Sequence, residues 1–218
     1  MGSFFAHQLP PGTRCLVHSR TAAKARSLAD AVNGGRCTSI ADLAPAGLVA
    51  VAVPAAEVAA VIDDLLRVVD DGTIVLNMAT AARVPDHQRS VRPDVHLVEA
   101  KVVGHAGTLA LGVPGLVVVD GPDHVFGTVA ACLPGFGRVV RGDASLVETV
   151  NRIGSKEAAR AVVAIRRGLA DANVPEGWFE PAIRNVASGT VRAIAEDDIG
   201  HFLRSVLDNL ERAERSPG

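Results

Sequence analysis

The stretch Leu48-Val-Ala-Val-Ala-Val53, closed by Pro54, decides the class of fold. Six consecutive aliphatic residues are typical of a strand that is buried on both faces, as in a parallel sheet covered by helices. A helical stretch follows from Ala55 to Val69, and the next aliphatic run is Thr73-Ile-Val-Leu-Asn77. A strand, a helix and a strand in this order predict two neighbouring parallel strands with a right-handed crossover.

The same alternation extends in both directions along the chain. The first residues, Met1 to Leu9, form a helical pattern that would turn Phe4, Phe5 and Leu9 towards the sheet. The further strands and helices are predicted at Arg14–His18, Thr21–Val32, Gly35–Ser39, Val95–Val103, Leu116–Val119, His124–Cys132 and Arg138–Val140. We therefore predict an α/β fold with a doubly wound parallel sheet in residues 1–143.

The pattern becomes purely helical after Asp143. Apolar residues recur at helical spacing from Ser145 to Asn173 without a proline, and Ser145 with Glu148 fits a capping box. Pro181 is placed to open a second helix that ends near Glu196, and a third is predicted from Ile199 to Arg212. Residues 144–214 are thus predicted to form a helical domain. Its broad apolar faces need burial, which favours a homodimer.

Composition excludes several classes of protein. The chain has 218 residues, of which 48% are hydrophobic, and its net charge of −2 comes without a run of Lys or Arg. Nothing therefore favours a nucleic-acid or membrane partner, and the apolar runs are too short to span a bilayer. Cys15, Cys37 and Cys132 lie far apart without a metal-binding spacing, which predicts free thiols in a reducing cytoplasm and no metal site.

Several segments resemble a known group of reductases. The run from Cys15 to Ala29 is similar to the second strand and helix of the pyrroline-5-carboxylate reductases and F420-dependent NADP oxidoreductases. The segments that resemble the following strands and turns of that group are Ala41-Asp-Leu43, Val49–Pro54, Glu57-Val58 and Ile74–Ala79. The resemblance implies a Rossmann-like fold, an NADP cofactor and dimerising helices. It also places the group's first strand and glycine loop upstream of Met1, so that Gly2 and Ser3 would begin the helix after that loop.

Candidate cofactor residues follow the predicted strands. Ser19, Arg20, Thr21 and Lys24 come after the strand where NAD-preferring sites carry an acidic residue, and Arg with hydroxyl groups suits the 2′-phosphate of NADP. The same residues also fit a helix cap beside exposed basic side chains. The remaining candidates are the backbone wall Ala52, Val53 and Pro54, which equally fit a plain strand end, and Asn77 and Ala79 near the nicotinamide.

Candidate chemical groups lie further along the chain. Lys101 and His105 lie around the end of the strand predicted at Val95–Val103 and can bind a carboxylate or donate a proton, although single basic residues there are also common on surfaces. Asn151 and Ser155 share one helix face and are candidate substrate-binding residues, or part of a solvated face. Gly135-Phe-Gly137 lacks a third glycine and precedes a strand, so it is not predicted to be a phosphate loop.

These patterns predict an NADP-dependent oxidoreductase that transfers a hydride to a small imine or carbonyl substrate. The substrate loop of the pyrroline-5-carboxylate reductases, rich in Ser, Gly and Pro, is not found between Val150 and Ala158, so that substrate is left open. Two alternatives remain. The chain can be a catalytically inactive remnant that serves as a binding or scaffold module, or an F420-dependent NADP reductase.

Overall fold

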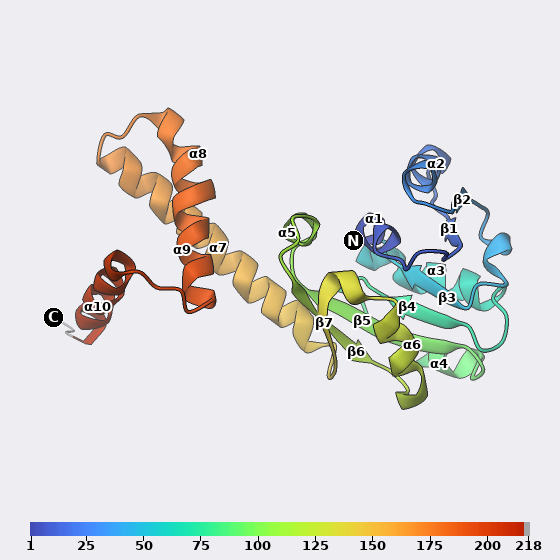
Figure 1. Cartoon of the computed structure of the whole chain (residues 1–218). Coiled ribbons are helices and arrows are strands. Elements are labelled where there is room, and N and C mark those ends of the chain that lie inside the picture. The colour runs from blue at the N-terminus through green and yellow to red at the C-terminus, as the bar shows by residue number, and fades with distance from the viewer. Residues whose placement is uncertain (216–218) are drawn as a thin grey trace. The chain divides into compact units, whose positions relative to one another are not determined.

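The structure is a computed structural model that describes residues 1–215, without the side chains of residues 211, 213 and 214. It divides into two compact units (Figure 1). The first, the α/β unit, spans Met1–Ile153, and the second, the helical unit, begins at Gly154. The sequence pattern changes near Asp143, just before helix α7 (Leu146–Asp171), whereas the two units divide within that helix.

The main sheet of the α/β unit has five strands in the order β3-β4-β5-β6-β7. These strands are β3 (Leu48–Val51), β4 (Ile74–Asn77), β5 (His96–Val103), β6 (Gly115–Asp120) and β7 (Gly137–Arg141). β3 and β4 are neighbours in parallel, with Leu48 opposite Ile74, so the predicted strand–helix–strand unit is confirmed. The α/β class with a mostly parallel sheet is confirmed as well.

One pairing differs from the prediction of a parallel sheet. β4 and β5 are parallel, as are β6 and β7, but β5 and β6 run antiparallel. The connection from Gly104 to Pro114 contains only the short helix α5 (Ala106–Ala110). A parallel crossover needs about a dozen residues or more, so this short connection favours an antiparallel return.

A separate two-stranded sheet lies at the start of the chain. β1 (Cys15–Val17) and β2 (Gly35–Cys37) are parallel and are joined by α2 (Ala22–Ala31). They are not hydrogen-bonded to β3, so the strands predicted for one sheet form two. Leu16 of β1 nevertheless packs against the apolar cluster that includes Val49 and Val51 of β3. Side-chain packing therefore links β1 to the main sheet.

The two faces of the main sheet are covered by different helices (Figure 1). On one face, α3 (Val58–Leu66) buries Val58, Ile62, Leu65 and Leu66 against β3 and β4. On the other face, α1 (Gly2–His7) and α6 (Phe126–Ala131) join a second apolar cluster that includes residues of β4, β5 and β6. Phe5 is buried there, with Phe4 and Leu9 packed against the same cluster, which confirms the predicted apolar side of the first helix. Within residues 1–215 the 3-10 turns are Ala41–Leu43, Ala55–Glu57, Asp123–Val125, Pro134–Phe136 and Glu176–Trp178.

Helices α4 (Asp86–Val91) and α5 are absent from the sequence prediction. α4 carries no apolar repeat, and its one buried residue is Gln88. The amide of Gln88 donates hydrogen bonds to the Ala59 carbonyl and the Asp63 carboxylate on α3, at 2.8 and 2.6 Å. Polar contacts rather than an apolar face therefore hold α4, which hydrophobic periodicity does not detect.

The helical unit contains most of α7, then α8 (Phe179–Pro181), a π-helical segment (Ala182–Ala187), α9 (Ser188–Ala195) and α10 (His201–Arg215). Pro181 lies inside the first turn instead of opening the helix, a position that tolerates a missing N–H. Just before α7, the carboxylate of Asp143 accepts a hydrogen bond from the Ser145 N–H at 2.8 Å. Asp143 therefore supplies a side-chain acceptor for a backbone donor at the start of this helix. Among residues 154–215, no described side chain is buried. No helix in the described residues has the length and apolar character needed to cross a membrane.

Candidate functional site

Most of the predicted cofactor residues lie where β1, β3 and β4 end. Arg20 follows β1 and forms an ion pair with Glu57, which follows β3, at 2.8 Å. Gly2 lies against the end of β3, since a Cβ at this position would be 3.1 Å from the Cβ of Ala52. Carboxyl ends of strands are where open α/β sheets bind ligands. The loops after β1 and β3 and the start of α1 therefore form the candidate site.

The loop after β1 presents hydroxyl and basic groups to solvent. Ser19, Arg20, Thr21 and Lys24 are all exposed. The Ser19 hydroxyl accepts the Thr21 N–H at 3.3 Å, while Thr21, the N-cap residue of α2, makes no capping bond with its own side chain. The side chain of Arg20 is 78% exposed although its guanidinium contacts Glu57. An incoming phosphate can reach it but has to compete with one carboxylate.

The end of β3 supplies an open backbone edge. Ala52 and Pro54 are exposed, and Val53 is half-buried against the cluster over α3. Ser3 is exposed on α1, where its backbone carbonyl accepts a hydrogen bond from the ring Nδ1 of His7 at 2.8 Å. These residues leave the end of β3 open to a flat ligand.

Asn77, the last residue of β4, is buried in a polar network. Its Nδ2 donates to the carboxylate of Glu99 and to the Ala82 carbonyl, each at 2.9 Å, and its Oδ1 accepts the Ala79 N–H at 3.1 Å. Glu99 stands opposite Asn77 on β5 and also accepts the Val84 N–H at 2.6 Å. The two side chains therefore hold the turn of residues 79–84, which follows β4.

Lys101 completes this network from β5. Its Nζ lies 2.9 Å from the Glu99 carboxylate and donates to the carbonyls of Ala82, at 2.6 Å, and of Ala79. Burial lowers the pKa of Lys101, and the nearby charge of Arg83 acts in the same direction, while Glu99 opposes the shift. His105, the other predicted proton donor, is exposed at the N-cap of α5 and is not among the partners of Lys101.

An open hollow lies beside the same turn. It has a volume of about 480 Å³ and is lined by Arg83, Val84, Pro85, Asp86, Arg89 and Asp120. Arg83 is 3.5 Å from Asp120, and Arg89 donates to the Leu97 carbonyl at 2.8 Å and lies 3.4 Å from Glu99. The sequence prediction missed these two arginines because they belong to no motif and reach the site only through the fold of the turn.

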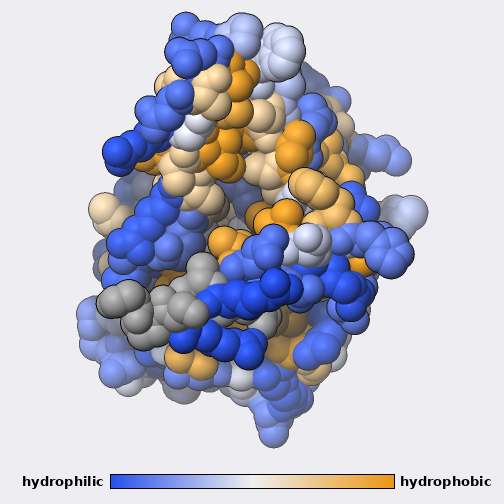
Figure 2. Space-filling view, turned by 90° about the vertical axis from the view of Figure 1, so that its left-hand side faces the viewer, coloured by the Kyte–Doolittle hydropathy of each residue, from blue (hydrophilic) through white to orange (hydrophobic). Residues whose placement is uncertain are grey.

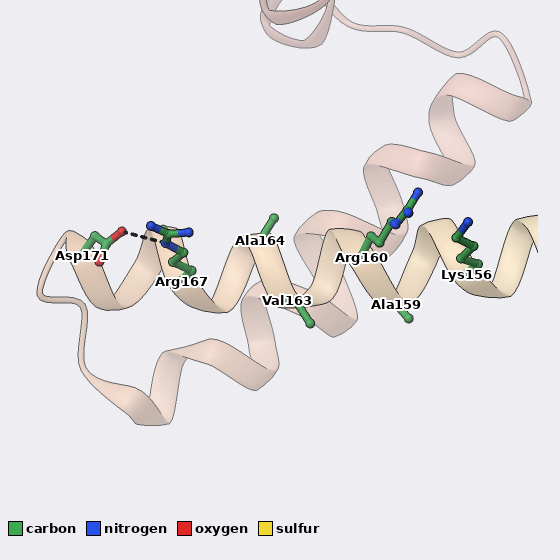
Figure 3. Close-up of a pocket in the computed structure, with 8 residues that line it drawn as sticks. Lys156, Ala159, Arg160, Val163, Ala164, Arg167 and Asp171 are labelled. Atoms are coloured by element: carbon green, nitrogen blue, oxygen red, sulfur yellow. Dashed lines mark ion pairs between the residues drawn. The ribbon is translucent and has the colours of Figure 1, made fainter.

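The two predicted substrate residues on α7 have different surroundings. The Asn151 amide donates to the Val102 carbonyl at 2.8 Å and accepts the Gly104 N–H at 3.3 Å, so it ties the start of α7 to the end of β5. Ser155 is exposed and belongs to the helical unit. Further along α7 an open groove of about 740 Å³ is lined by Lys156, Ala159, Arg160, Val163, Ala164, Arg167, Gly168 and Asp171 (Figure 3). Figure 3 also shows the contact between Arg167 and Asp171, at 3.9 Å.

The Gly135-Phe-Gly137 motif has a structural role. Gly135 and Phe136 end a 3-10 turn and Gly137 begins β7, which agrees with the predicted strand there. Gly137 has a φ of +103°, and a Cβ there would lie 2.3 Å from the Gly115 carbonyl oxygen. Glycine is therefore required for the close pairing of β6 and β7. Within the described residues, no group of three or more His, Cys, Asp or Glu is arranged to hold a metal ion.

Comparison with known proteins shows the fold. No protein-family model matches the sequence, and no curated protein matches it. Among solved structures, a pyrroline-5-carboxylate reductase from Coxiella burnetii is 14% identical with a TM-score of 0.71, covering 100% of this chain and 82% of that chain. A pyrroline carboxylate reductase from Plasmodium falciparum, with NADP bound, is 12% identical with a TM-score of 0.67, covering 96% and 79%. A 3-hydroxyisobutyrate dehydrogenase from Mycobacterium tuberculosis is 15% identical with a TM-score of 0.60, covering 79% and 62%. The chain thus has the Rossmann-like fold of these proteins, as the resemblance implied.

Proposed function

We propose that this chain binds NADP at the ends of β1, β3 and β4 and acts as an oxidoreductase on a small imine or carbonyl compound. The observation that carries the proposal is the loop after β1, where an exposed arginine stands between two exposed hydroxyl groups, Ser19 and Thr21. The solved structure from Plasmodium falciparum, which has NADP bound, supports the choice of a nicotinamide cofactor.

The residues present fit the adenosine end of such a cofactor. Arg20 offers a planar fork of donors for the 2′-phosphate, and Lys24 adds a second positive charge. The hydroxyl groups of Ser19 and Thr21 supply further donors. With Glu57 at 2.8 Å, the Arg20 guanidinium reaches the end of β3, where the 2′-phosphate is expected. Gly2, Ser3, Ala52, Val53 and Pro54 form the adjoining surface.

The nicotinamide end is assigned to the turn after β4. When bound, the reduced cofactor would supply a hydride to the carbon of the C=N or C=O bond. Asn77, Glu99 and Lys101 hold the turn of residues 79–84, so Ala79 keeps a defined place at this end. A firmly held turn limits the orientations open to a ring that packs on it, which is how positioning assists a reaction.

The nitrogen or oxygen of the reduced bond also needs a proton. We assign its delivery to His105, which is exposed and follows β5. Lys101 would have to release Glu99 and two carbonyl groups before it gave up a proton, so its contacts favour a positioning role. Asn151 and Ser155 remain proposed substrate-binding residues, and Asn151, on α7, is held at the end of β5 by its bond to the Val102 carbonyl.

The helical unit supports the proposal of a homodimer. Its helices carry apolar side chains that are exposed to solvent, and Figure 2 shows orange, hydrophobic surface on the side that faces the viewer. The exposed large apolar residues of α7 to α10 include Val163, Val186, Val191, Ile194, Phe202, Val206 and Leu210. A unit with no buried side chain among those described lacks a core of its own. A second copy of the chain would supply the missing cover.

The first test is a titration with NADPH and with NADH, followed by nicotinamide fluorescence. The Arg20→Asp variant should lose about 1–3 kcal/mol more binding energy for NADPH than for NADH, because only NADPH carries the 2′-phosphate. Arg26→Asp is the matched control, since Arg26 is an exposed arginine on α2, the helix that follows the loop of Arg20. The proposal would be refuted if neither cofactor bound at millimolar concentration. Equal losses of NADPH and NADH binding in Arg20→Asp would reject the assignment of Arg20 to the 2′-phosphate.

A second test follows oxidation of NADPH with a panel of cyclic imines, aldehydes and ketones. Turnover of any of them by the wild-type protein supports the oxidoreductase. Tight NADPH binding without turnover would instead indicate a binding module. Turnover with deazaflavin F420 and NADP but with no imine or carbonyl compound would favour the F420-dependent alternative.

A further inference from the structure

Two histidines meet at the edge of the main sheet where β5 begins. His96 is the first residue of β5, and His124 lies in the 3-10 turn after β6. Because β5 and β6 are antiparallel, the start of one strand lies beside the end of the other. The candidate cofactor site lies at the carboxyl ends of β3 and β4, so this pair is at the opposite end of the parallel strands.

The contact between the two rings is close and converging. The two Nε2 atoms are 3.4 Å apart, and the ring centroids are 4.7 Å apart with the planes at 79°. A hydrogen bond between the nitrogens would be long, since such bonds are about 2.7–3.2 Å. Two imidazole nitrogens bound to one tetrahedral zinc ion at about 2.0–2.1 Å lie roughly 3.3–3.4 Å from each other. The observed separation therefore matches a shared metal ion better than a direct bond.

The backbone that carries each histidine is held by hydrogen bonds. The His96 N–H donates to the Thr73 carbonyl at 2.9 Å, within the pairing of β4 with β5. His124 is followed by Val125, which is buried in the core and whose N–H bonds the Pro122 carbonyl at 3.3 Å. Two ligands on ordered backbone lose little freedom when they bind an ion, which favours binding.

The positive charge of Arg141, which lies near this turn, does not exclude a cation because it is balanced. Its guanidinium is paired with Asp123 and stacked 4.5 Å over the ring of Phe126. His124 is exposed and His96 is half-exposed, so water can fill the remaining coordination positions.

We propose that His96 and His124 form a two-histidine site for a borderline divalent metal such as Zn²⁺, with the other positions open to water or to a ligand from another molecule. Imidazole nitrogens suit Zn²⁺, Ni²⁺ and Cu²⁺ and not Mg²⁺ or Ca²⁺. This site is independent of the proposed cofactor site, since its two residues take no part in NADP binding.

The test is a calorimetric titration of the metal-free full-length protein with Zn²⁺ alone. The wild-type protein should bind one ion per chain at this site, and His96→Ala and His124→Ala should each weaken binding by about tenfold or more. His87→Ala is the control, because His87 is an exposed histidine on α4. Nitrogen NMR of the rings adds a second readout, in which Zn²⁺ should shift Nε2 of both residues in the wild-type protein. Binding that is unchanged in both variants, or shifts at one ring only, would overturn the proposal.

Discussion

Replacing Glu99 by Gln should destabilise the α/β unit strongly. The side chain of Glu99 is fully buried, and that of Lys101 is 2% exposed. Without the carboxylate, the Lys101 ammonium keeps two carbonyl partners but has no counter-charge within contact distance. Removing one partner of a buried ion pair costs about 3–5 kcal/mol, so we expect a loss of that order for Glu99→Gln.

The reverse substitution should cost less. Lys101→Met leaves Glu99 with the amide of Asn77, the Val84 N–H and the guanidinium of Arg89. Because three donors still serve the carboxylate, we expect a loss of about 1–3 kcal/mol, mostly from the freed carbonyl groups. The network of contacts therefore predicts a larger loss of unfolding free energy for Glu99→Gln than for Lys101→Met.

Urea unfolding followed by far-ultraviolet circular dichroism measures both variants. The single tryptophan, Trp178, lies in the helical unit, so fluorescence would report on the wrong part of the chain. Hydrogen exchange of the β4 and β5 amides checks that the loss belongs to the α/β unit. A cost below about 1 kcal/mol for Glu99→Gln, or a larger cost for Lys101→Met, would refute the reasoning.

Three further predictions concern other regions. Glu57→Gln removes the carboxylate that competes for Arg20, so NADPH affinity should rise by up to about 1 kcal/mol while NADH affinity stays constant; a fall in NADPH affinity would contradict this. Hydrogen bonds from Thr38 and Ser39 lower the pKa of Asp42 to about 2, below its usual value of about 3.9. Their stabilising effect is thus present above about pH 4 and lost as the pH falls towards 2, and the difference in melting temperature between wild-type protein and Asp42→Asn should narrow over that range rather than stay constant. Phe202→Asp should convert a dimer to a monomer in light scattering, whereas Val91→Asp, an equally apolar exposed position on α4, should not; no change for Phe202→Asp would count against the dimer.

The strands of the α/β unit could be predicted from aliphatic runs. Leu48–Val53 and Thr73–Asn77 contain β3 and β4 because strands buried on both faces need such residues throughout. α4 escaped prediction because Gln88 holds it through polar contacts. The orientation of β6 depends on the length and path of the connection through α5, which periodicity does not reveal.

The candidate site could be predicted only in part. Ser19 and Arg20 are adjacent in sequence, so their shared chemistry is visible in the chain. The network of Asn77, Glu99 and Lys101 is not, because the register of β4 against β5 brings Asn77 opposite Glu99. The same holds for His96 and His124, which meet only through the antiparallel return of β6.

The open apolar helices after Gly154 have a consequence for how the protein melts. If these helices gain their stability from a second chain, their unfolding is a bimolecular equilibrium that follows mass action. Heating should then produce two separate transitions, of which the one reported by Trp178 rises in temperature as the sample is concentrated. The transition of the sheet, whose core is complete within one chain, should stay where it is.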